Sequence, residues 1–118
     1  MLLHILLYLW LTAFSVAPNA ASNKLVLEWS AMHQRDGLTG FYVYRQTDSG
    51  WVSLTESHIP KTDLGHDQYR IRDQVPCDRT YTYLLRAFGQ TNGQSYFEDW
   101  RVNNTYLPCA NGPGGINR

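Results

Sequence analysis

One stretch of alternating side chains, from Tyr81 to Phe88, constrains the fold of this chain more than any other feature. Successive side chains of an extended strand point to opposite faces, so every second residue lies on the same side. One side of this stretch is then apolar and consists of Tyr81, Tyr83, Leu85 and Ala87. A strand with an apolar face needs a second layer to bury it. The stretch therefore predicts a packed sheet.

The N-terminal region differs in composition from the rest of the chain. No Lys, Arg, Asp or Glu precedes Lys24, and residues 2–16 are almost wholly apolar. This run is short for a membrane span, which needs about 20 apolar residues, but it fits the hydrophobic region of a secretory signal peptide. Small residues between Ala17 and Ala21 offer a cleavage region, so we expect a signal peptide over residues 1–21. An uncleaved anchor and a core element of the domain are the alternatives.

Beyond that segment the chain has the size of one domain, which we expect over residues 22–109. The last residues, 110–118, are rich in Gly and Asn and have little to bury, so we expect a disordered tail. The 10 basic and 10 acidic residues cancel, which disfavours nucleic acid or an anionic membrane as a partner. The predicted location is extracellular, or periplasmic if the source is bacterial.

Short alternating segments separated by turn residues continue through this domain. They cover residues 25–29, 41–45, 51–54, 69–73 and 95–107. Strands of this length and spacing, without helical periodicity, are typical of an antiparallel β-sandwich. We therefore expect an all-β fold.

Four motifs, in order along the chain, resemble those of the fibronectin type III family. They are Trp29 on the second strand, Gly40–Arg45 with the pattern Gly-Phe-Tyr-Val-Tyr-Arg, Val75 with Tyr81 as a tyrosine corner, and Gly93–Ser95 before the last strand. The resemblance covers residues 24–107 and implies an immunoglobulin-like sandwich. The family's first strand has only Pro18–Asn23 available, so we expect that strand to be short or missing.

Alternation and this resemblance together predict which side chains form the interior. The predicted core is Leu27, Trp29, Phe41, Val43, Tyr69, Ile71, Tyr81, Tyr83, Leu85 and Ala87.

The chain contains two cysteines, Cys77 and Cys109. In an exported protein such a pair more often forms a disulfide than two free thiols, and neither Cys has a metal-binding spacing. The resemblance implies that both lie at the same pole of the sandwich. On that basis we predict a disulfide that ties down the C-terminal edge.

The sequence shows no catalytic or cofactor site. His33, His58 and His66, with Asp36, Asp63 and Asp67, lie in predicted loops without the spacing of metal ligands. No Ser, Thr or Cys occupies a recognisable nucleophile turn. We therefore expect a protein that is not an enzyme and uses no cofactor or metal.

One group of side chains is a candidate binding patch. Tyr42, Tyr44, Leu84 and Arg86 should project from the outer face of the sheet, with Trp51 and either Phe97 or Trp100 nearby. Aromatic residues and Arg are enriched at protein interfaces, and aromatic rings also stack on sugars. Ordinary cross-strand packing is the alternative interpretation. Separately, Asn103-Asn104-Thr105 is a glycosylation acceptor pattern if the source is eukaryotic.

These observations leave three hypotheses for function. The first is a secreted, non-catalytic binding or adhesion module that contacts another protein at the cell surface or in the extracellular matrix. The second is a carbohydrate-associated accessory module, and the third is a structural spacer from a larger extracellular protein. Beyond the signal segment, none of them involves a membrane.

Overall fold

A computed structural model describes residues 14–19, 22–30, 37–61 and 68–109 of the chain. The strands are β1 (Ser15–Asn19), β2 (Lys24–Ser30), β3 (Leu38–Thr47), β4 (Gly50–Ser53), β5 (Ile59–Pro60), β6 (Gln68–Gln74), β7 (Arg79–Thr91) and β8 (Gln94–Leu107). The all-β prediction is confirmed. Within the described ranges, no helix is long and apolar enough to cross a membrane.

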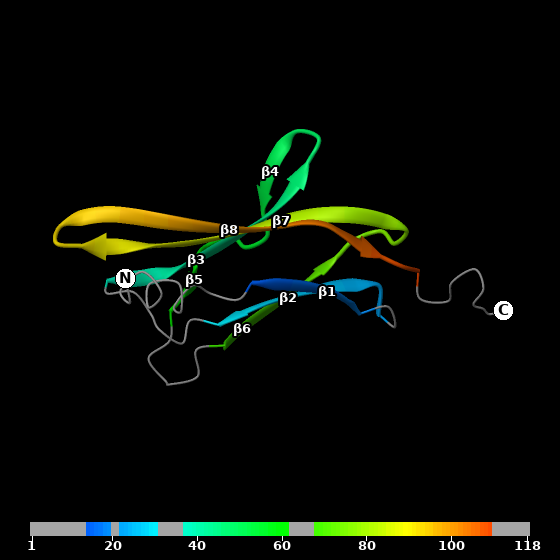
Figure 1. Ribbon diagram of the computed structural model, residues 1–118, viewed down its shortest axis with the longest axis horizontal. Helices are drawn as coiled ribbons and strands as arrows, with labels where there is room; N and C mark the ends of the chain where they lie inside the picture. Colours follow the sequence, from blue (N-terminus) through cyan, green and yellow to red (C-terminus); the bar gives the residue numbers. More distant parts are fainter. Residues whose placement is uncertain (1–13, 20–21, 31–36, 62–67, 110–118) are drawn as a thin grey trace, which may run out of the picture.

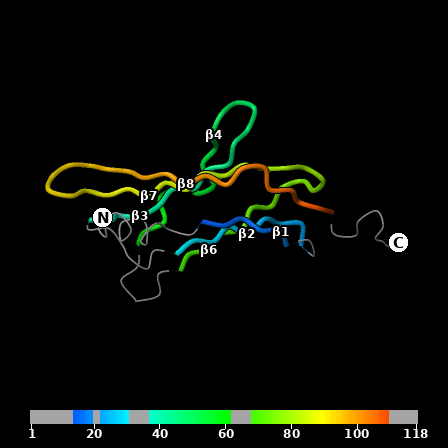
Figure 2. The backbone as a smooth tube through the Cα atoms, viewed as in Figure 1, coloured from blue at the N-terminus to red at the C-terminus, as the bar shows by residue number. Residues whose placement is uncertain are grey.

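The strands form two antiparallel sheets that face each other as a sandwich. One sheet has the order β1-β2-β6 and the other has the order β4-β3-β7-β8, with β5 paired to β3. The two sheets lie as a lower and an upper layer, and the β7–β8 hairpin extends past the lower one (Figure 1). The backbone tube shows the β3–β4 hairpin standing away from both layers (Figure 2).

The first strand is present and short. β1 pairs with β2 in antiparallel register, with Val16 opposite Leu27, and Val16 packs against the core. From the sequence we expect this strand within Pro18–Asn23. β1 instead begins upstream of that segment, at Ser15, and lies inside the predicted signal peptide 1–21. Cleavage after residue 21 would therefore remove β1. The cleavage position stays a prediction, and the predicted tail 110–118 lies outside the described residues.

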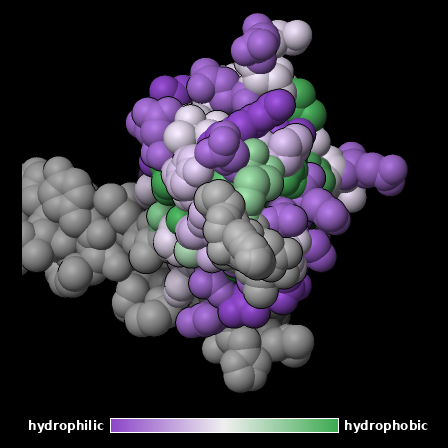
Figure 3. Space-filling view, turned by 90° about the vertical axis from the view of Figure 1, so that its right-hand side faces the viewer, coloured by the Kyte–Doolittle hydropathy of each residue, from purple (hydrophilic) through white to green (hydrophobic). Residues whose placement is uncertain are grey.

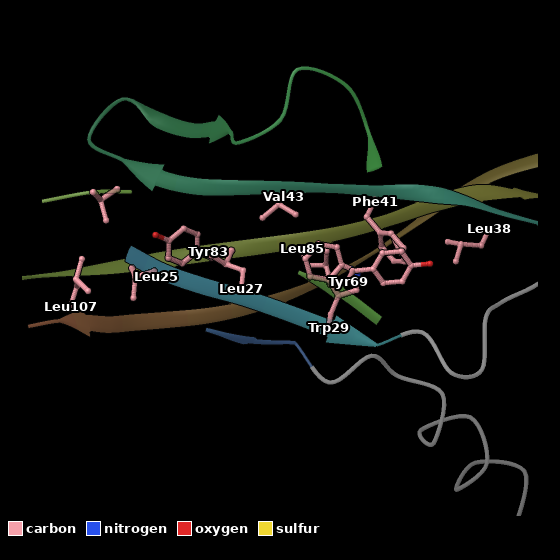
Figure 4. Close-up of a cluster of buried hydrophobic side chains, with 12 residues drawn as sticks. Leu25, Leu27, Trp29, Leu38, Phe41, Val43, Tyr69, Tyr83, Leu85 and Leu107 are labelled. Carbon is pink, nitrogen blue, oxygen red and sulfur yellow. The ribbon is translucent and has the colours of Figure 1, made fainter. Parts of the chain in front are cut away.

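The core lies between the sheets, where inward-pointing side chains from both layers meet (Figure 4). Eight of the predicted core residues are buried: Leu27, Trp29, Phe41, Val43, Tyr69, Tyr83, Leu85 and Ala87. The other two, Ile71 and Tyr81, are partly buried and pack against this cluster. Leu25, Leu38, Val75 and Leu107 complete it. Trp29 stacks on Tyr69 with ring centroids 5.5 Å apart.

An ionic group crosses the core between the two layers. The Arg45 Nη1 of β3 donates hydrogen bonds to both carboxylate oxygens of Asp73 on β6, at 2.6 and 2.5 Å. The Tyr83 hydroxyl of β7 donates to the same carboxylate at 2.6 Å. Asp73 is thereby paired and hydrogen-bonded from the opposite sheet, as a buried carboxylate requires.

Cys77 and Cys109 form the disulfide that the sequence predicts. It joins the loop before β7 to the end of β8 across a sequence separation of 32 residues. Closing a loop of this length stabilises a fold by roughly 3–4 kcal/mol in the chain-entropy model.

Seen from the end of the molecule where β8 finishes, hydrophilic residues cover most of the coloured surface (Figure 3).

A tight turn fixes the register of the long β7–β8 hairpin. Asn92 and Gly93 both have positive φ, 54° and 78°, which is the backbone of a two-residue type I′ turn. The pairing runs without a slip from Thr91 opposite Gln94 to Tyr83 opposite Val102. This register decides which β8 side chains share the outer face with those of β7.

Candidate binding surface

The outer face of the larger sheet carries the aromatic and charged side chains of three adjacent strands. Tyr42 on β3 lies opposite Arg86 on β7, and Arg86 in turn lies opposite Asp99 on β8. Phe88 lies opposite Phe97. Because side chains alternate along each strand, these residues point away from the core that their neighbours fill.

Tyr42 is the centre of an aromatic cluster on this face. Its ring stacks on Phe88, with ring centroids 5.1 Å apart, and lies 6.1 Å from the Tyr44 ring. His58, from the loop before β5, meets Phe88 edge-on at 5.2 Å and also contacts Tyr42. These mutual contacts fix the orientation of the rings before any partner binds.

Arg86 links this cluster to β8. Its Nε and Nη2 donate to the two carboxylate oxygens of Asp99 at 2.8 and 2.9 Å. The hydrogen bond that Arg86 donates to Asp99 raises the pKa of Arg86, although burial acts in the opposite direction. The guanidinium also lies over the Phe97 ring, 4.2 Å from its centroid. Arg86 is therefore held in place as a charged group with one face on an aromatic ring.

The rings and Arg86 line a shallow hollow of about 560 Å³, which we call the aromatic hollow. It is lined by Thr39, Tyr42, Tyr44, Arg86, Phe88, Gly89, Gln90, Ser95, Tyr96 and Phe97. Phe97 is 61% exposed, more than the other exposed large hydrophobic side chains of the described residues, Trp51, Val52 and Tyr106. The lining of the hollow combines aromatic rings with one charged group and the neutral polar residues Thr39, Gln90 and Ser95.

The structure divides the predicted patch. Tyr42, Tyr44 and Arg86 line the aromatic hollow, but Trp51 and Leu84 do not. Trp51 is 38% exposed and its ring lies 5.0 Å from the guanidinium carbon of Arg101. Leu84 is only 9% exposed and so offers little surface to a partner.

Sequence reasoning missed several members of the site, among them Phe88 and His58, and left Phe97 undecided. Phe88 follows Leu84 and Arg86 on the outward-facing side of β7, so the alternation could have predicted that Phe88 lies on the outer face. His58 lies in the loop directly before the two-residue strand β5, which brings it to the cluster. No sequence pattern predicts that strand. Of the two aromatic alternatives on β8, Phe97 lines the hollow, whereas Trp100 packs against the core.

The remaining candidate residues lie elsewhere. Asn103 is exposed on β8, beside a register shift in the pairing with β7. His33, His66, Asp36, Asp63 and Asp67 lie outside the described residues. Across the described ranges, no group of three or more His, Cys, Asp or Glu side chains could hold a metal ion.

Comparison of the chain with protein-family models, curated proteins and solved structures finds no match.

Proposed function

We propose that this chain is a secreted, non-catalytic binding module that contacts another protein through the aromatic hollow. The observation that carries the proposal is the exposure of Phe97 next to Arg86 and the Tyr42–Phe88 cluster. Trp, Tyr and Arg are the residue types most enriched among those that dominate binding energy at protein interfaces, and Phe is also enriched at interfaces. Here they are held by contacts with one another, which lowers the entropy cost of ordering them on binding.

Two further observations support an extracellular domain of the fibronectin type III kind. The Tyr81 hydroxyl donates to the Pro76 carbonyl, which is the hydrogen bond of a tyrosine corner. The Cys77–Cys109 disulfide is the type of bond that persists in oxidising compartments. Together with the apolar N-terminal segment, these features favour export of the protein to the cell surface or the extracellular matrix.

Capture from extracellular fluid or matrix extract with the immobilised chain tests the proposal. We expect the Tyr42→Ala, Phe97→Ala double variant to lose at least about 30-fold in affinity for the captured protein, because hot-spot residues each contribute about 2 kcal/mol or more. Tyr106→Ala is the matched control, since Tyr106 is also exposed, at 49%, but lies at the disulfide end. Equal capture by the double variant and the wild type would exclude the aromatic hollow as the binding site.

A carbohydrate is the second candidate partner. Thr39, Gln90 and Ser95, which carry hydroxyl and amide groups, are among the residues that line the hollow, and sugars need such groups beside an aromatic ring. Titration with soluble polysaccharides, followed by Trp fluorescence, distinguishes the two candidates. A saturable shift that the Tyr42→Ala, Phe97→Ala variant lacks would favour carbohydrate over protein. A spacer domain would show neither capture nor a saturable shift.

A further inference from the structure

β8 is the edge strand of the larger sheet. It pairs with β7 on one side, and no strand among the described residues pairs with its other side. An edge of this length presents backbone N–H and C=O groups that can accept another strand. The regular part of this edge ends at Asn103 and Asn104, where a register shift and the positive φ of Asn104, 55°, mark a β-bulge.

The turn geometry identifies which residues direct their backbone groups to this edge. In a two-residue hairpin the residues flanking the turn, Thr91 and Gln94, exchange both backbone hydrogen bonds, and every second pair repeats this. The backbone N–H and C=O groups of the even-numbered residues of β8, up to Val102, therefore form hydrogen bonds with β7. The backbone groups of Phe97, Asp99 and Arg101 consequently point to the open edge.

The side chains along this edge have an alternating charge pattern. Asp99 and Arg101 are both exposed and stand two residues apart on the same face. Asp99 binds Arg86, whereas Arg101 lies over Trp51 and makes no ion pair with any described residue. In an antiparallel pairing, opposite charges directly across from each other stabilise the pair and like charges destabilise it.

We propose that β8 pairs with β8 of a second copy of this chain, antiparallel about a two-fold axis at Trp100. In this register Asp99 of each copy lies opposite Arg101 of the other, which gives two complementary pairs. The pairing runs from Phe97 to the bulge at Asn103. Such a contact is isologous and closed, because the same surface of both copies is used.

Neighbouring registers fit this charge pattern less well. An axis at Asp99 places the two Asp99 carboxylates opposite each other, and an axis at Glu98 does the same with the two Glu98 carboxylates. An axis at Phe97 pairs the two phenyl rings but leaves Asp99 and Arg101 without opposite charges across the strand. Only the axis at Trp100 pairs both charges of each copy.

The dimer would have a consequence for the outer faces. A two-fold axis perpendicular to a continuous sheet keeps the outer faces of both copies on the same side, so the two aromatic hollows would face the same direction. A ligand with two copies of the same epitope would then bind with increased avidity. The strand pairing itself does not depend on what the aromatic hollow binds.

Charge reversal tests the pairing with the full-length, oxidised chain. Asp99→Arg and Arg101→Asp each replace two attractions by two repulsions in a homodimer. We expect each variant alone to have a dimer dissociation constant raised at least about tenfold in sedimentation velocity. An equimolar mixture of the two variants restores both complementary pairs, so we expect tagged D99R to co-purify untagged R101D. The double variant D99R/R101D should dimerise like the wild type, and Glu56→Arg, an exposed charge reversal away from β8, should leave dimerisation unchanged.

Three results would overturn the proposal. The first is a wild type that stays monomeric at its highest soluble concentration. The second is dimerisation of either single variant at wild-type strength, which would indicate the Phe97 register or association through the apolar N-terminal segment. The third is failure of the mixture to associate while circular dichroism shows both variants folded. R101D leaves the Arg86–Asp99 pair of each copy intact, so this variant keeps the test decisive if D99R does not fold.

Discussion

Two Arg–Asp pairs, each with its arginine on the larger sheet, differ in their surroundings. Arg45 binds Asp73 between the layers, and Arg86 binds Asp99 on the outer face. Both arginines contact both carboxylate oxygens of their partner, at 2.6 and 2.5 Å for the inner pair and at 2.8 and 2.9 Å for the outer pair. The side chains of the inner pair are 23% and 10% exposed, and those of the outer pair are 36% and 32% exposed.

The difference shows that similar geometry does not imply a similar contribution to stability. Burial lowers the pKa of Arg45, but the hydrogen bond and charge of Asp73 outweigh it, so the pKa is raised. Removing one partner of the inner pair leaves a charge with little water to replace it. On the outer face, water reaches both groups and screens their attraction. The inner pair therefore holds the two sheets in register, and the outer pair mainly orients Arg86 in the aromatic hollow.

Replacing each carboxylate by its amide should separate the two pairs most strongly. We expect Asp73→Asn to lower the free energy of unfolding by about 3–5 kcal/mol, because Arg45 is left without its counter-charge. The matched change Asp99→Asn should cost about 1 kcal/mol or less. Urea unfolding of dilute protein, followed by Trp fluorescence, measures both values. Similar losses for the two variants would contradict the role assigned to burial.

Truncation of apolar side chains extends the comparison to packing. Leu85 is fully buried on the inner face, so Leu85→Ala should cost about 2–5 kcal/mol through the cavity that it leaves. Phe97→Ala removes a larger side chain, but one that is 61% exposed. Its loss should cost about 1 kcal/mol or less, mainly the contact with Arg86. Thermal unfolding of the two variants measures the difference, and a larger effect of Phe97→Ala would show that the outer face supports the fold.

The fold was predictable where alternation is strict. Tyr83 and Leu85 alternate with outward residues over enough positions to identify the buried face of β7. The same rule contained a signal for the inner ion pair, because Arg45 follows Phe41 and Val43 on the inward side of β3. Asp73 likewise follows Tyr69 and Ile71 on β6. A charge in phase with an apolar face predicts a buried partner, but not which of the other strands supplies it.

Other parts of the molecule depend on contacts that a local pattern does not contain. β1 lies in a segment whose apolar composition is also that of a signal peptide, so composition alone could not assign it to a sheet. β5 has two residues, too few for any periodicity, yet the loop that leads to it carries His58 to Phe88. The aromatic hollow forms only when the register of β7 and β8 sets Phe97 opposite Phe88. That register is fixed by the turn at Asn92 and Gly93.

Alkaline pH should distinguish Tyr83, which is buried between the sheets, from Tyr106 on the surface. The expected change in stability is the smallest of those predicted. Burial, and then the hydrogen bond to Asp73, raise the pKa of Tyr83. A tyrosine in an unfolded chain has a pKa of about 10. Above that pH the Tyr83 hydroxyl therefore loses its proton in the unfolded state but keeps it in the folded state. The unfolded state then binds fewer protons, and stability falls as pH rises, by up to about 1.4 kcal/mol per pH unit for this one group.

Tyr83→Phe should therefore make the fall of stability with pH less steep above about pH 10. It should also lower stability near neutral pH, because the hydrogen bond to Asp73 is lost. The hydrogen bond to Asp78 also raises the pKa of Tyr106, but this ring lies on the surface, where water screens the interaction. Tyr106→Phe is thus the control and should change the slope less. Urea titrations between neutral and alkaline pH measure both slopes, and equal flattening by the two variants would show that burial between the sheets is not what separates these tyrosines.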